Sequence, residues 1–347
     1  MFKLMRSGLL AVTCMLAAMT TTAVAGPPLT AVALPHDEAP HHNFLEWWYF
    51  VGHLSGVDPS GQTRKYGYEV TVFQVDAVPP LMATYSAHFA ITDHRTGKHV
   101  AEHRIKSAAI PNSSNRFDLE VAGWTASGTS GTYALNAVMS DQKYSASLNL
   151  QASLPPVLHG NSGIIPYGPF GSSAYYSYTS LNTTGTIVDN GVPIAVTGTS
   201  WQDRQWGDFN ILAPAGWNWF SIQLSNNVQY MLYYIQDAFG SIVQKVGTKV
   251  VNGVATPIPA SQMSLDILDY WTSPKSLITY PNKWRVNVPG GSMTVTPVQK
   301  AQELFKFGHR TYWEGDSTVT GTLGGQSVNG AGYTEVNPYF QPYLSLP

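Results

Sequence analysis

One short stretch of the sequence places an acid and a base between two indoles. Residues 198–208 read GTSWQDRQWGD, in which Asp203 and Arg204 lie between Trp201 and Trp206. Only 12% of the chain is charged, so charges among aromatic residues need a specific partner. A guanidinium can stack on an indole while it binds a carboxylate, which would create a preorganised polar site in an apolar wall. The alternative is structural, an arginine and aromatic rings that pin one sheet to the next.

Carboxyl groups beside aromatic residues are candidate proton donors, because desolvation raises the pKa of a carboxyl. Adding water to an isolated alkene, or cyclising a polyene, needs one such donor in a dry pocket whose aromatic faces stabilise a developing cation. The candidate catalytic residues are Asp203, Glu46 and Arg204. Arg204 is expected to hold Asp203 ionised, whereas Glu46 has no neighbouring cation in sequence and is expected to be the better acid. For each carboxyl, a structural ion pair is the alternative.

The residues expected to line a ligand site are mostly aromatic, and His88, Tyr234 and Glu335 are further candidate donors among them. The predicted ligand-binding residues are Trp47, Trp48, His88, Tyr176, Trp201, Trp206, Trp219, Tyr234 and Glu335.

No metal site and no cofactor are expected. His94, His99 and His103 surround one predicted hairpin turn, but no acidic residue accompanies them at a recognisable spacing. The sequence also contains no Gly-x-Ser-x-Gly nucleophile motif and no glycine-rich phosphate loop between a strand and a helix.

Short strands and turns must position these side chains. The chain has 19 Tyr, 13 Phe and 10 Trp with 31 Gly and 23 Pro, and it has no long runs of helix-forming residues. This composition predicts an all-β protein. Residues 44–54 alternate so that Trp47, Tyr49 and Val51 share one face while Trp48 and Phe50 share the other. Both faces are aromatic, so both are expected to be covered.

An internal repeat divides the chain. The aromatic run that begins at Trp47 recurs at Trp217, at a constant offset of 170 residues. Each half also closes on a Gly-x-x-aromatic-x-acid segment, which ends at Asp203 in the first half and at Glu335 in the second. The repeat predicts two copies of one β-barrel, with these two acids as counterparts. The expected organisation is an N-terminal arm over residues 26–43, a first barrel over 44–209 and a second over 210–347.

The first residues predict export. Residues 1–25 contain Lys3 and Arg6, a short apolar run and then Ala-Val-Ala, which is typical of a cleavable signal peptide and of a secreted or periplasmic protein. Cys14 is the only cysteine, so the processed chain would contain no disulfide. The net charge is −2, with no basic face and no apolar run long enough for a membrane helix. Neither a nucleic acid partner nor stable membrane insertion is therefore expected.

Several motifs resemble the AttH and carotenoid 1,2-hydratase family. They are HHNFLEWWYFVGHL, SAHFAITDHRTG, YYSY at 175–178, GTSWQDRQWGD and YWEGDSTVTGTLGGQSVNGAGYTEV, and they occur in this order over most of the chain. The resemblance implies two lipocalin-like antiparallel β-barrels packed together. It also implies relatives that include carotenoid hydratases and fungal enzymes making hydrated or cyclised polyketide and isoprenoid products. Carotenoid hydratases tend to have a histidine at the position of Arg204. An arginine cannot act as an acid near neutral pH, so the resemblance does not imply carotenoid hydration itself.

Three functions agree with these observations. The first is cofactor-free hydration or cyclisation of a hydrophobic small molecule such as a polyene, isoprenoid or polyketide, and the second is non-catalytic transport of such a molecule. The third is binding or cleavage of glycans, which would need two carboxylates on opposite walls of a groove. The two-barrel repeat disfavours the third function.

Overall fold

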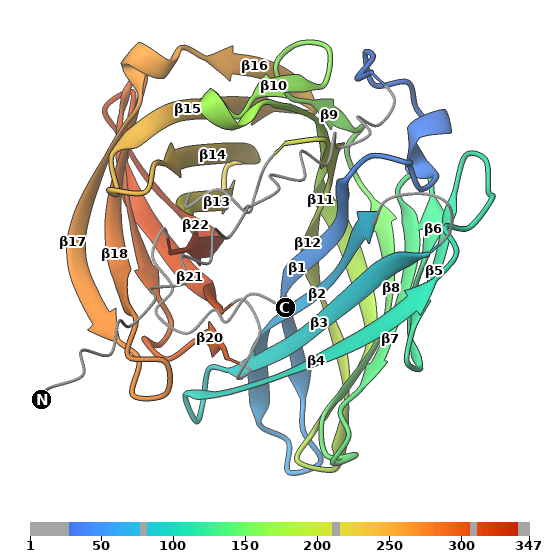
Figure 1. Cartoon of the computed structure of the whole chain (residues 1–347). Coiled ribbons are helices and arrows are strands. Elements are labelled where there is room, and N and C mark those ends of the chain that lie inside the picture. The colour runs from blue at the N-terminus through green and yellow to red at the C-terminus, as the bar shows by residue number, and fades with distance from the viewer. Residues whose placement is uncertain (1–27, 77–81, 210–215, 306–310, 339–347) are drawn as a thin grey trace, which may run out of the picture.

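The computed structural model describes residues 28–76, 82–209, 216–305 and 311–338, and the predicted signal peptide lies outside them. Nearly all regular structure in these ranges is antiparallel strand, arranged in two curled sheets that form barrel-like units beside each other (Figure 1). The predictions of an all-β class and of two barrel-like units are confirmed. No helix in the described part of the chain is long and apolar enough to cross a membrane.

The first unit contains a sheet with the strand order β4-β3-β2-β1-β12-β11-β8-β7-β6-β5, and the short β9 and β10 pair with β11. Its strands are β1 (Leu45–Val57), β2 (Thr63–Asp76), β3 (Ala83–Asp93), β4 (Lys98–Ala108), β5 (Phe117–Val121), β6 (Trp124–Thr129), β7 (Thr132–Val138), β8 (Ser145–Ala152), β9 (Val157–Leu158), β10 (Ile164–Pro166), β11 (Ser172–Asp189) and β12 (Val192–Gly207). Two short 3-10 turns accompany them, η1 (His36–Glu38) and η2 (Gly168–Phe170).

The second unit contains a sheet with the order β16-β15-β14-β13-β22-β21-β19-β18-β17, and β20 pairs with β21. Its elements are β13 (Gly216–Leu224), β14 (Val228–Gln236), β15 (Ile242–Val251), β16 (Val254–Ile258), the 3-10 turn η3 (Ala260–Gln262), β17 (Ser264–Thr272), β18 (Thr279–Val288), β19 (Gly291–Pro297), β20 (Glu303–Leu304), β21 (Tyr312–Leu323) and β22 (Gln326–Asn337). In each unit the first strand pairs with the last, β1 with β12 and β13 with β22. The predicted boundary near residue 210 lies outside the described residues.

Alternation along the strands directs side chains to two environments. On β1, Trp48 and Phe50 belong to the core inside the first unit, whereas Tyr49 and Val51 belong to an apolar cluster between the units. On β13, Phe220 likewise lies in the core of the second unit and Trp219 in the cluster between them. The two sheets are therefore joined by a shared aromatic interface, with β1 and β2 beside β22 and β21.

Candidate functional site

A cavity lies in this interface, which we call the inter-unit cavity. Its main lobe has a volume of about 180 Å³ and adjoins a small lobe of about 30 Å³. Both lobes are lined by Trp47, Phe73, Trp217 and Glu335. An apolar cavity of about 150 Å³ can hold benzene, and a water molecule needs about 10–15 Å³. The main lobe therefore has room for a ring or a short branched chain segment, and the small lobe for water.

Asp203 is in the wall of the small lobe, where β12 and β11 place it among hydrogen-bond donors. The Tyr175 hydroxyl donates to its Oδ2 over 2.6 Å, the Trp201 indole N–H donates to its Oδ1 over 2.6 Å, and the Ser177 hydroxyl also donates to Oδ1. Ser177 is its direct neighbour on β11. The residue is only 3% exposed.

The protonation of Asp203 is set by this environment. Burial raises the pKa of its carboxyl to about 7, although the hydrogen bonds from Ser177, Tyr175 and Trp201 act in the opposite direction. Near neutral pH a substantial fraction of Asp203 is therefore protonated and able to donate. No cation contributes to this value, and Asp203 has no ion pair among the described residues.

Arg204 does not pair with Asp203, so that prediction is wrong. Neighbouring residues of a strand point to opposite faces, and Arg204 points into the first unit. Its Nη1 donates to Oε1 of Glu46 over 2.6 Å, and both side chains are fully buried. The expected stacking on indoles does occur, with the guanidinium 4.0 Å from the ring centroid of Trp48 and 5.6 Å from that of Trp206.

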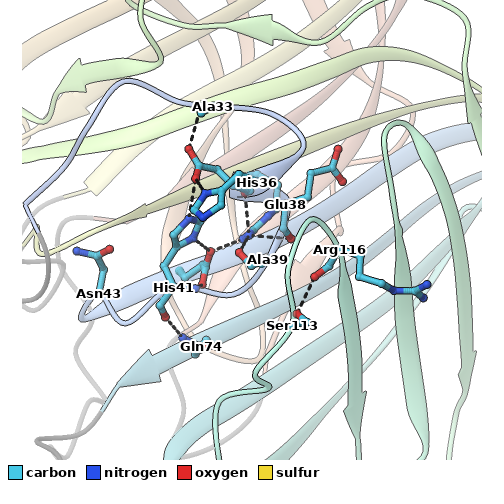
Figure 2. A network of polar contacts seen from close by, with 12 residues as sticks. Ala33, His36, Glu38, Ala39, His41, Asn43, Gln74, Ser113 and Arg116 are labelled. Atoms are coloured by element: carbon cyan, nitrogen blue, oxygen red, sulfur yellow. Dashed lines mark hydrogen bonds and ion pairs between the residues drawn. The ribbon is translucent and has the colours of Figure 1, made fainter.

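The Glu46 and Arg204 pair holds the N-terminal arm at Ala39 and His41, two residues of the polar network in Figure 2. The Nη2 of Arg204 donates to the carbonyl of Ala39 over 2.9 Å, while the backbone N–H of His41 donates to Glu46 over 2.8 Å. The His41 ring lies 2.7 Å from Glu46 and stacks on Trp206 at 4.2 Å. Burial alone would raise the pKa of Glu46, but the charges of Arg204 and His41 lower it below its usual range. Glu46 is thus held ionised, contrary to the expectation that it is the better acid.

The other predicted residues fall into two groups. Trp47, His88 and Glu335 line the main lobe, Trp219 lines the small lobe, and Trp201 contacts Asp203. The structure places the remaining four inside the units: Trp48, Tyr176 and Trp206 in the core of the first, and Tyr234 in the core of the second. These four do not line the inter-unit cavity.

The histidines around the predicted turn are separated. His94 contacts Asp316 over 2.5 Å, His99 contacts Thr92 over 2.9 Å, and His103 stacks on His88. Within the described ranges, no group of three or more His, Cys, Asp or Glu side chains is arranged to hold a metal ion.

Glu314 and Glu69, two buried acids of the interface with raised pKa values, were not predicted from the sequence. The Oε1 of Glu314 accepts a hydrogen bond from the Tyr49 hydroxyl over 2.7 Å, and Glu314 lies directly opposite Glu335 in the sheet. Burial, together with the charges of Glu335 and Glu69, raises the pKa of Glu314 well above its usual range. Burial also raises the pKa of Glu69 to about 7, against hydrogen bonds from Thr71 and Tyr312. Alternation within YGYEVTV places Glu69 on the face of β2 that carries Phe73, so this signal was present in the sequence.

Comparison with known proteins gives similar structures and a family that span most of the chain. The chain is similar to the solved structure of an AttH protein from Nitrosomonas europaea, with 28% identity, a TM-score of 0.78, and coverage of 90% of this chain and 98% of that one. It is also similar to kievitone hydratase from Nectria haematococca, with 19% identity, a TM-score of 0.67, and coverage of 92% and 95%. CghA shares the fold at 13% identity, with a TM-score of 0.55 and coverage of 90% and 94%. A search of curated proteins finds no match. The AttH-like family model matches residues 25–339, and the chain therefore belongs to the AttH-like family.

Proposed function

We propose that the inter-unit cavity binds an apolar unsaturated small molecule and that Asp203 protonates it. The expected ligands are a polyene, an isoprenoid or a polyketide, and the reaction is a hydration or a cyclisation without a cofactor. The observation that carries the proposal is the position of Asp203, a buried carboxyl with a raised pKa in the wall of an aromatic cavity.

The chemistry follows from this position. The π electrons of an alkene take the proton of Asp203, so a C–H bond forms and positive charge develops on the neighbouring carbon. The rings of Trp47, Trp217 and Trp219 line the cavity and stabilise that charge. In a hydration, the oxygen of a water molecule bonds to the cation and then loses a proton. In a cyclisation, a second double bond attacks the cation and a neighbouring carbon loses the proton.

The small lobe supports the hydration in particular. Its volume of about 30 Å³ is enough for a water molecule beside Asp203. Kievitone hydratase, which shares the fold, is by name an enzyme that adds water, and this agrees with the same class of reaction. A carrier would need the apolar main lobe but would have no use for a protonated carboxyl.

The test uses molecules extracted from the purified protein and identified by mass spectrometry, together with all-trans-retinol and geranylgeraniol as probes. Each is incubated in D₂O with the wild type, with Asp203→Asn and with Asp208→Asn. The control residue belongs to the same GTSWQDRQWGD segment but accepts its hydrogen bonds from Asn43 and Phe44.

Protonation by Asp203 predicts one carbon-bound deuterium per turnover in the wild type and in the control. Asp203→Asn should lose this incorporation by about 100-fold or more. Recovery of every compound unchanged from the wild type would identify a carrier, and incorporation that survives in Asp203→Asn would remove this residue from the chemistry.

A further inference from the structure

We propose that Tyr312, held between His88 and Glu69, is a second proton-transfer group of the inter-unit cavity. It serves the main lobe, as Asp203 serves the small lobe. This inference rests on the proposed function, because it supplies the base that the second half of that reaction needs.

The three side chains form a continuous hydrogen-bonded chain across the interface. The Tyr312 hydroxyl of β21 donates to Oε1 of Glu69 on β2 over 3.0 Å. The Nδ1 of His88 on β3 lies 2.6 Å from the same hydroxyl oxygen. When Tyr312 donates to Glu69, Nδ1 of His88 donates to Tyr312, and its Nε2 is left to accept from the Ser86 hydroxyl at 3.1 Å. His88, Ser86 and Tyr312 all line the main lobe, so a proton can enter this chain from the cavity.

Glu69 is able to store that proton. It is fully buried, and its Oε1 also accepts a hydrogen bond from Thr71 over 2.8 Å. Its Oε2 has no hydrogen-bond partner among the described residues. An ionised carboxylate with one oxygen unsatisfied is costly in an apolar interior, whereas a protonated carboxyl is tolerated. A purely structural role would be served as well by glutamine, which carries no charge.

The duplicated architecture places Tyr312 where a matching group acts in the first unit. In the first unit, Tyr175 stands two residues before Ser177, which pairs with Asp203 in the sheet. In the second unit, Tyr312 stands two residues before Glu314, which pairs with Glu335. Each of these tyrosines donates to a buried carboxyl, Tyr175 to Asp203 and Tyr312 to Glu69. Two tyrosine and carboxyl pairs thus serve one cavity.

The relay balances the proposed reaction. After Asp203 has protonated the alkene, a water molecule that attacks from the main lobe passes its proton to the oxygen of Tyr312, while the Tyr312 proton moves to the ionised form of Glu69. In a cyclisation, the proton lost from carbon takes the same route. Glu69 then returns a proton through the chain to water, and Asp203 is reprotonated from solvent, so the protein is unchanged.

The test is a pH titration of the His88 imidazole by ¹⁵N nuclear magnetic resonance in the ligand-free protein. Other groups around this ring are His103, which stacks on it at 4.2 Å, and Glu335, which lines the same lobe. The variants are Glu69→Gln, Tyr312→Phe and the double change. Tyr280→Phe is the matched control, because Tyr280 is a buried tyrosine that donates to Glu303 over 2.9 Å in the core of the second unit.

A relay predicts that Glu69→Gln shifts the titration midpoint of His88 by about 0.5 pH units or more. Glu69→Gln should cause almost no shift when Tyr312 is also replaced by Phe, because the hydroxyl that links His88 to Glu69 is then missing. Tyr280→Phe should not shift the midpoint of His88. The proposal is overturned if Glu69→Gln has no effect, or if its effect is the same with Phe at position 312, which would indicate simple electrostatics. Because no ligand is involved, either outcome leaves the role of Asp203 to its own deuterium test.

Discussion

Glu335 occupies in the second sheet the ladder position that Asp203 occupies in the first. Asp203 lies opposite Tyr49, and Glu335 lies opposite Trp219, which follows Tyr49 by the 170 residues of the sequence repeat. Both acids line the small lobe of the inter-unit cavity. Their surroundings differ, because the neighbour of Asp203 on the next strand is Ser177 whereas the neighbour of Glu335 is Glu314. Asp203 therefore has a hydroxyl beside it on the next strand, and Glu335 has a second carboxyl there.

Asp203→Asn is expected to change the pH dependence of stability. A carboxyl whose pKa is about 7 in the folded protein and 3.8 in the unfolded chain binds more protons when folded. The wild type therefore loses stability as the pH rises from about 4 through 7, and the asparagine variant lacks this loss. In denaturant unfolding, the free energy of unfolding of the variant relative to that of the wild type should increase by a few kcal/mol between pH 4 and pH 8. A difference independent of pH would mean that Asp203 is ionised in the folded protein.

Glu335→Gln is expected to relieve the carboxyl cluster of the second unit. The raised pKa of Glu314 has burial as its main cause and the charge of Glu335 as the next. Removing that charge lowers the pKa of Glu314 in the folded protein. The protein then loses less stability as the pH rises above the pKa that Glu314 has in the unfolded chain. Relative to the wild type, the free energy of unfolding should increase by about 1–2 kcal/mol at pH 8 and be unchanged at pH 4. The exposed Asp118 supplies the control, Asp118→Asn, and an equal gain there would refute the explanation.

Arg204→Met is expected to destabilise the protein and to release the N-terminal arm. It leaves the buried carboxylate of Glu46 with His41 as its remaining charged partner, and the loss of the Arg204 charge costs about 3–5 kcal/mol. Combining it with Glu46→Leu should recover much of the loss. Thermal melts measure the stability, and limited proteolysis followed by mass spectrometry measures cleavage within residues 28–43. The control is Arg95→Met, at an exposed arginine that donates to Gln62, and it should change neither the melting temperature nor the cleavage of the arm. Equal protection of the arm in all variants would show that Arg204 does not anchor it.

Trp219→Ala is expected to destabilise both units together. Its indole N–H donates to the Tyr175 hydroxyl over 2.9 Å, and its ring packs edge to face with Tyr49 at 5.2 Å, so it joins the two sheets. Removing a buried indole costs about 3–5 kcal/mol. Calorimetry of this variant should show one transition at a lower temperature. The control Trp271→Ala, on the edge strand β17, should lower the transition temperature less. Two separate transitions in the wild type would mean that the interface does not couple the units.

The sequence predicted those features that depend on one strand or on the repeat. Alternation in residues 44–54 predicted that Tyr49 and Trp48 face different environments, and the repeat matched Asp203 with Glu335. The pairing of Asp203 with Arg204 was wrong because adjacency in sequence was taken for adjacency in space, although the alternation used for β1 applies equally to β12. The contact between His88 and Tyr312 joins residues 224 positions apart, and no pattern in one strand shows how the two units dock.

The most direct test of the central claim, that the cavity between the units holds the apolar ligand, is a tryptophan fluorescence titration with all-trans-retinol. It compares the wild type with Val75→Phe, which fills the main lobe, and with Val254→Phe, which adds the same side chain at a residue that is 67% exposed. Retinol should quench the tryptophan fluorescence of the wild type and of the control to the same extent, and it should bind the cavity-filled variant about 10-fold or more weakly. Maltohexaose should quench none of the three proteins. Equal retinol binding by all three proteins, or quenching by maltohexaose alone, would contradict the account.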